Sequence, residues 1–173
     1  MLKILIVEDE PLLAKTLKHL IELNPRFEVI AIADDLQSAL DAAEERRPDL
    51  ALVDLQLARG STGFTVAVKL NEIGVPSLFT TGKAPGFPMP DLALGCLMKP
   101  YTEEDIVRAL KAAEDILRGR ERLRPSRPGN LTLYSEAPAP EPVLAEPGDA
   151  FMPEPALAAP KTLKARLSNW WSA

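Results

Sequence analysis

The chain has 173 residues, 46% of them hydrophobic, and a formal net charge of −5, which suits one folded domain with an appendage. This mild acidity gives no electrostatic support for nucleic-acid binding, and a single cysteine, Cys96, excludes a disulfide or zinc framework within the chain. The apolar start breaks at Glu8-Asp9-Glu10, too early for a signal peptide, and no apolar run approaches the roughly 20 residues of a membrane span. We therefore expect a cytoplasmic protein.

The first part of the chain alternates short apolar runs with stretches of helical spacing. Strands are predicted at residues 2–7, 27–33 and 50–54. The first helix begins at Pro11, whose missing N–H costs little in a first turn, and the second is capped by Asp34-Asp35. The expected buried faces are Leu13, Leu17, Leu20 and Ile21 in the first helix, and Leu36, Ala39, Leu40 and Ala43 in the second.

The same alternation continues to residue 118. Strands are predicted at residues 75–81 and 96–99, and Thr102 is expected to cap a final helix, with Asp105 completing an imperfect capping box. The expected buried faces are Phe64, Ala67, Leu70 and Ile73 in the third helix, and Ile106, Leu110, Ala113 and Leu117 in the final helix.

The connection over residues 82–90 is irregular. It holds three prolines and two glycines in nine residues, and an interior proline costs a helix about 3 kcal/mol. We therefore expect a mobile loop where a fourth helix would otherwise lie, with at most one turn over residues 91–94.

Strands that alternate with helices through five units predict an α/β fold with helices on both faces of a parallel sheet. Right-handed crossovers and the strand order 2-1-3-4-5 would make it a flavodoxin-like, doubly wound, five-stranded sheet. In that order Glu8 and Asp9, which follow the first strand, meet Asp54 at the end of the third strand.

Side chains of complementary chemistry end the other two strands. Thr81 ends the fourth strand and Lys99 the fifth, on the other side of Asp54. Gathered carboxylates favour a hard cation such as Mg²⁺. A carboxylate flanked by a cation, a hydroxyl and an ammonium suits phosphoryl transfer to Asp54. Taken singly, each residue also has an ordinary explanation as a turn, capping, strand or surface residue.

This set of residues resembles that of two-component response-regulator receiver domains over roughly residues 1–118. The resemblance rests on Glu8-Asp9, Asp54, Thr81-Gly82 and Lys99-Pro100-Tyr101. The stretch Phe79-Thr80-Thr81-Gly82 further resembles the "FATGUY" subgroup of single-domain receivers, which lack a regular fourth helix.

The resemblance implies a role for each site residue. Asp54 would accept a phosphoryl group from a sensor histidine kinase or a histidine phosphotransfer protein. Lys99 and Thr81 would contact the phosphoryl oxygens, and Lys99-Pro100 would be a cis peptide. Mg²⁺ would be held by Glu8, Asp9, Asp54 and the backbone carbonyl of Gln56.

Two positions depart from the family pattern. Receivers usually carry an aromatic switch residue three positions before the lysine, and here that residue is Cys96. We expect an ordering of the loop over residues 82–94 to replace the usual coupling. Thr80 and Thr81 both offer a hydroxyl, and adjacency to Gly82 favours Thr81.

The composition changes after Gly119. Prolines alternate with alanine and glutamate over residues 119–160, which predicts a disordered linker. Residues 161–173 predict a short basic amphipathic helix that carries Leu163, Leu167, Trp170 and Trp171 on one face. Three sites for this helix remain open: a groove on a downstream protein partner, the chain's own folded domain, or an anionic membrane surface.

The expected function is therefore that of a phosphoryl-accepting signalling protein, not an enzyme, which acts through protein contacts without a conventional output domain. Two alternatives stay open. A haloacid-dehalogenase-like phosphatase would need a second aspartate two residues after the nucleophile, where this chain has Gln56. A phosphorylation-independent interaction module on a receiver fold is the other alternative.

Overall fold

One sheet of six strands organises the part of the chain described by this computed structural model, residues 1–57, 62–120 and 128–134. The order is β2-β1-β3-β4-β5-β6, and every neighbouring pair is parallel except β5 and β6. The predicted order of the first five strands is confirmed. The strands are β1 (Leu2–Val7), β2 (Phe27–Ala33), β3 (Leu50–Asp54), β4 (Ser77–Thr81), β5 (Gly95–Met98) and β6 (Leu131–Leu133).

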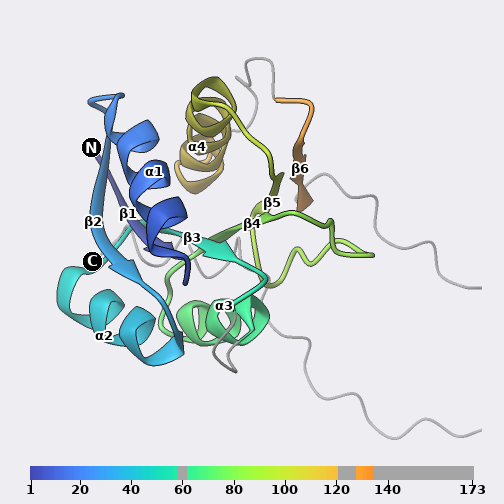
Figure 1. Ribbon diagram of the computed structural model, residues 1–173. Helices are drawn as coiled ribbons and strands as arrows, with labels where there is room; N and C mark the ends of the chain where they lie inside the picture. Colours follow the sequence, from blue (N-terminus) through green and yellow to red (C-terminus); the bar gives the residue numbers. More distant parts are fainter. Residues whose placement is uncertain (58–61, 121–127, 135–173) are drawn as a thin grey trace, which may run out of the picture.

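Helices cover both faces of this sheet, as a doubly wound fold requires. Figure 1 shows α1 and α4 on one face and α2 and α3 on the other. Alternate residues of β1 divide between the two layers, with Ile4 and Ile6 in one core and Leu5 and Val7 in the other. The predicted flavodoxin-like class is therefore confirmed. The helices are α1 (Pro11–Glu22), α2 (Leu36–Arg46), α3 (Gly63–Glu72) and α4 (Glu103–Leu117).

The buried faces of α1 and α3 differ from the predicted ones by part of a turn. Leu13 is 37% exposed and Leu20 is only partly buried, whereas Ala14 is buried with Leu17 and Ile21. Phe64 and Ile73 are exposed, whereas Gly63 and Val66 are buried with Ala67 and Leu70. The prediction chose the largest side chains, but small residues are what allow a helix to pack closely on a sheet.

The remaining two helices follow their predicted patterns more closely. In α4 all four expected residues are buried, and the capping box is complete: Thr102 Oγ1 accepts from Asp105 N, and the Asp105 carboxylate accepts from Thr102 N. Asp35 caps α2. Ala39 and Ala43 are buried there, while Leu36 and Leu40 are partly buried against the same core.

No helix joins β4 to β5, as the prolines of this connection predict. A single turn forms near its end, where the amides of Leu92 and Ala93 both donate to the Met89 carbonyl. This turn covers residues 90–92 and so begins one residue before the expected span of 91–94. The predicted mobility of the loop stays a prediction.

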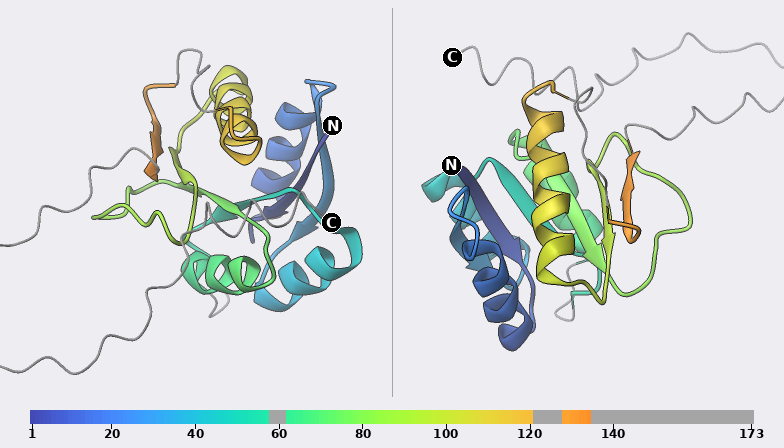
Figure 2. Two further views of the ribbon diagram at one scale, coloured as in Figure 1. Left: turned by 180° about the vertical axis from the view of Figure 1, so that it is seen from behind. Right: turned by 90° about the horizontal axis from the view of Figure 1, so that it is seen from above.

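The strand β6 corrects the predicted linker, because residues 128–134 fold onto the sheet. Asn130 holds one end of β6, accepting from Met98 N at 2.9 Å and donating through Nδ2 to Met98 O at 3.1 Å. Tyr134 N holds the other end by donating to Leu94 O at 2.9 Å. Figure 2 shows β6 at the edge of the sheet next to β5. A strand of three residues within a proline-rich region gives almost no periodic signal.

The rest of the predicted tail, including the basic amphipathic helix of residues 161–173, lies outside the described residues. Within the described part, no helix is long and apolar enough to cross a membrane.

Candidate functional site

Lys99 joins two carboxylates that come from distant parts of the chain. Its Nζ lies 2.9 Å from Glu8 Oε2 and 2.8 Å from Asp54 Oδ2. Glu8 follows β1, Asp54 ends β3 and Lys99 follows β5, so the carboxyl ends of three parallel strands supply this cluster. Ligands of such sheets bind at this edge. The predicted meeting of Glu8, Asp54 and Lys99 is therefore found in the structure.

The cluster is short of positive charge. Burial raises the pKa of the Glu8 carboxyl above its ordinary value of 4.5, against the opposing hydrogen bond and attraction of Lys99. Burial also acts to lower the pKa of Lys99, but the hydrogen bonds and negative charges of Asp54 and Glu8 outweigh it, so this pKa is raised. One ammonium thus serves two buried carboxylates.

The loop after β3 is held to Asp54 by its backbone. Asp54 Oδ1 accepts a hydrogen bond from Gln56 N at 3.0 Å, while Oδ2 faces Lys99. A Cβ on Gly82 would lie 3.9 Å from Gln56 Oε1. The start of the loop after β4 is therefore close to the loop after β3.

Thr81 is buried at the tip of β4, but its hydroxyl bonds to Lys83. It donates to Lys83 O at 3.1 Å and accepts from Lys83 N at 3.3 Å. The strand register pairs Asp54 with Thr80, so Thr81 lies one residue beyond the aspartate. A contact between Thr81 and a group on Asp54 would require the hydroxyl to leave Lys83.

The remaining predicted residues lie at the same edge. Asp9 is partly buried beside Glu8, and Lys99-Pro100 is a cis peptide, as the resemblance implied. Among the described residues, no three acidic, histidine or cysteine side chains are arranged as a metal-binding group. The predicted magnesium ligands therefore stay a prediction.

Gly63, which sequence reasoning missed, sets the distance between α3 and the end of β3. A Cβ at this position would lie 2.1 Å from the Asp54 carbonyl oxygen and 2.7 Å from Leu55 Cα. Gly63 N donates to Leu55 O at 3.4 Å. Only glycine lets the helix approach so closely. Its place just after Thr62, the N-cap of α3, was the available signal.

Comparison with known proteins defines the class that this fold and site belong to. Residues 4–111 match the response regulator receiver domain family. The match spans more than half of the chain. The chain therefore belongs to this family, whose members act in two-component signalling. The narrower "FATGUY" assignment stays a prediction.

Curated relatives are bacterial response regulators. The sensory transduction protein LytT of Bacillus cereus is 35% identical over 117 residues, which cover 64% of this chain and 46% of that protein. The phyllosphere-induced regulator PhyR of Methylorubrum extorquens is 43% identical over 81 residues, covering 46% of this chain and 30% of PhyR. The chain thus spans less than half the length of each of these two relatives.

Solved structures agree on the fold. The CheY-like receiver domain protein from Methanospirillum hungatei JF-1 gives a TM-score of 0.60 at 25% identity, covering 70% of this chain and 98% of that one. The signal receiver domain of a modulated diguanylate cyclase from Desulfovibrio desulfuricans G20 gives 0.55 at 28% identity, covering 64% and 91%.

Proposed function

We propose that this chain accepts a phosphoryl group on Asp54 from a sensor histidine kinase or a histidine phosphotransfer protein. The observation that carries the proposal is the position of Lys99 Nζ, 2.8 Å from Asp54 Oδ2 at the carboxyl edge of the sheet. An ammonium in this position can form charge-assisted hydrogen bonds with the oxygens of a phosphoryl group attached to the same carboxylate.

In the proposed transfer, an Asp54 carboxylate oxygen attacks the phosphorus of a phosphohistidine. The new bond joins this oxygen to phosphorus, and the bond between phosphorus and the histidine nitrogen breaks, with its electron pair leaving on the imidazole. Lys99 would turn from Asp54 Oδ2 to the transferred oxygens, and Thr81 would exchange Lys83 for one of them. Gly82 has no side chain to obstruct the group's approach.

The residues at the sheet edge suit Mg²⁺ as cofactor. Carboxylate and carbonyl oxygens are the ligands that Mg²⁺ prefers, and the shortage of positive charge around Glu8 favours a cation nearby. The ligands would be Glu8, Asp9, Asp54 and the Gln56 carbonyl. When bound, the ion would supply neutralisation of the phosphoryl oxygens' charge.

The output of this domain would be a change in protein contacts, with no reaction catalysed on a further substrate. The irregular connection between β4 and β5 and the added strand β6 both lie next to β5, on the same side of the domain. A downstream protein partner would recognise this side in its phosphorylated state.

Incubation with acetyl phosphate and Mg²⁺, read by intact mass, tests the proposal. The wild type should gain one phosphoryl group, whereas Asp54→Ala should gain none. Asp41→Ala is the control, because Asp41 is exposed on α2 and bonds only locally to Gln37; it should behave as wild type. No gain in any of the three proteins would instead favour the phosphorylation-independent interaction module.

A further inference from the structure

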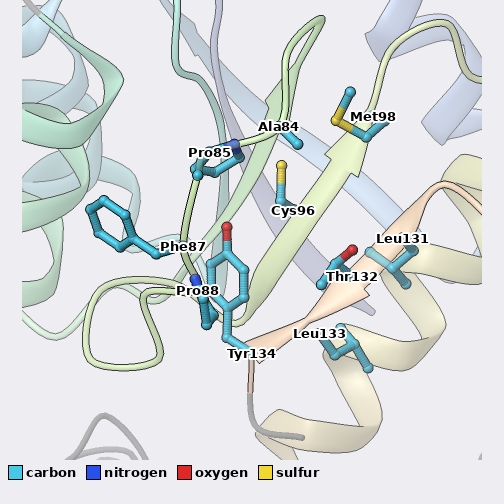
Figure 3. Close-up of a pocket in the computed structure, with 11 residues that line it drawn as sticks. Ala84, Pro85, Phe87, Pro88, Cys96, Met98, Leu131, Thr132, Leu133 and Tyr134 are labelled. Carbon is cyan, nitrogen blue, oxygen red and sulfur yellow. The ribbon is translucent and has the colours of Figure 1, made fainter. Parts of the chain in front are cut away.

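A cavity of about 450 Å³ lies next to β5. Its walls come from the loop after β4, from β5 and from β6, and include Pro85, Phe87, Cys96, Met98, Leu131 and Tyr134. Figure 3 shows Tyr134 and Cys96 pointing into the same space below Pro85. The volume falls in the range of ligand pockets, about 300–1,000 Å³.

The lining of this cavity suits an uncharged, largely apolar occupant. Burial raises the pKa of the Cys96 thiol to about 11, so this group stays protonated and neutral. Phe87, on the loop, is 69% exposed, which is unusual for a large aromatic side chain. No charged side chain is among the lining residues.

One polar group in the cavity lacks a suitable partner. Tyr134 is 4% exposed, and its hydroxyl makes no hydrogen bond of normal geometry with the described residues. The thiol of Cys96 lies nearby but is a weak hydrogen-bonding group. A buried tyrosine hydroxyl usually finds a partner, so an occupant with a hydrogen-bonding group would satisfy it.

Residues near the end of the chain have apolar side chains that also carry a hydrogen-bond donor. Its only two tryptophans are Trp170 and Trp171, and Leu163 and Leu167 precede them at helical spacing. An indole is largely apolar and has one N–H donor, which matches the apolar walls and the acceptor oxygen of Tyr134.

The connection also has the right starting point and length. Residues 135–160 leave directly from Tyr134, a wall of the cavity. Their 26 residues span up to about 80 Å at about 3.1 Å per residue for a proline-rich segment. Pro147-Gly148, a pair typical of turns, falls near the middle. A tether of this kind gives an effective concentration on the order of millimolar.

We infer that this cavity is the docking site for the chain's own C-terminal segment, residues 161–171, with a tryptophan side chain placed against Phe87 and Tyr134. Docking would bury the chain's two tryptophans on the domain that also carries the phosphorylation site. The docked segment would cover the side of the domain, formed by the β4–β5 connection and β6, that the downstream partner is proposed to recognise.

Tryptophan fluorescence of the full-length protein tests this directly, because both tryptophans lie in the segment. The wild type should show blue-shifted emission, protection from acrylamide quenching and no dependence on protein concentration. Phe87→Ser and Tyr134→Phe should each shift the emission toward that of exposed tryptophan and raise the quenching constant. Phe87 is exposed and the phenylalanine keeps the Tyr134 ring, so both variants should fold, as circular dichroism can check.

The control is Leu12→Ser, which removes an equally exposed apolar side chain from α1 and should leave the emission unchanged. Emission typical of solvent-exposed tryptophan in the wild type would overturn the inference. So would a blue shift that appears only at high protein concentration, which indicates a second copy, or only with anionic vesicles, which indicates a membrane. A blue shift that Phe87→Ser and Tyr134→Phe leave intact would place the segment elsewhere.

Discussion

The buried Glu8 carboxylate is a site residue whose charge lowers the stability of the folded chain. The Glu8 carboxyl is buried next to another carboxylate, and a single ammonium compensates both. Its raised pKa means that folding disfavours the ionised form. A residue kept in an unfavourable charge state in this way is expected where a cation or a charged group is to be bound.

Replacement of Glu8 by the neutral, isosteric glutamine should therefore stabilise the metal-free protein at pH 7. Because the folded state binds this proton more tightly, wild-type stability should fall, relative to Glu8→Gln, as the pH rises from 4.5 through the folded pKa. Added Mg²⁺ should stabilise the wild type more than the variant. Urea unfolding at several pH values measures both effects.

Glu44→Gln, at an exposed position of α2, serves as the control and should show neither effect. If Glu8→Gln were less stable than wild type at pH 7 without Mg²⁺, the ion pair with Lys99 would outweigh the cost of burial. Lys99 alone would then compensate the site's carboxylates, and the site would not be short of positive charge.

Gly63 allows a second test at the residue scale. An alanine Cβ would lie 2.1 Å from the Asp54 carbonyl oxygen, so α3 or the loop after β3 must shift. Gly63→Ala should lower the free energy of unfolding by about 1–3 kcal/mol and slow phosphorylation of Asp54. Gly86→Ala, where an added Cβ meets nothing within 4 Å, should do neither. Equal behaviour of the two variants in urea unfolding would contradict this.

At the scale of single elements, apolar runs predicted the strands well and helix faces less well. The bounds of β1, β2 and β3 follow directly from runs such as Leu50–Asp54, because fully buried parallel strands are apolar on both faces. The face of a helix also depends on which small residues permit close packing. Ala14 and Gly63 are buried for that reason, and hydrophobicity alone does not rank them above Leu13 or Phe64.

The strand β6 could not be predicted from its own residues, because its stability comes from contacts with β5. Gly95 makes room for it: an added Cβ would lie 2.3 Å from the Thr132 carbonyl oxygen. Isolated three-residue segments have no stable structure, so only the sheet edge and the core positions of Leu131 and Leu133 define this strand.

Gly95→Ala should therefore detach β6 while the rest of the sheet persists. Amide hydrogen exchange should accelerate at Tyr134 and Met98, whose N–H groups bond across this pair of strands. Exchange in β1 should change little. Gly129→Ala, at a position with open space, is the matched control. Unchanged protection at Tyr134 in Gly95→Ala would show that β6 is not held by this contact.

At the scale of the whole molecule, the fold brings together groups that are up to 91 residues apart in sequence, as Glu8 and Lys99 are. The sequence predicted this cluster because strand ends of a parallel sheet share one edge. It could not predict the hydrogen bonds between Thr81 and Lys83, which depend on the path of the loop. Those bonds connect the site to the loop that lines the cavity.

Occupation of the site should therefore change the loop over residues 82–94. If the Thr81 hydroxyl turns to a phosphoryl group, it releases Lys83, and the loop should adopt a new, more ordered arrangement. Backbone NMR with and without beryllofluoride and Mg²⁺ measures this, and α2 amides provide the internal control. Amides of residues 82–94 that stay unchanged when the Asp54 region shifts would contradict the proposed coupling.

The most direct test of the central claim is to locate the acyl phosphate. The protein is treated with acetyl phosphate and Mg²⁺, reduced with borohydride, which converts an aspartyl phosphate to homoserine, and then mapped by peptide mass spectrometry. Homoserine is expected at position 54 alone, and only when Mg²⁺ is present. Homoserine at another aspartate, or its absence throughout a folded protein, would contradict the claim.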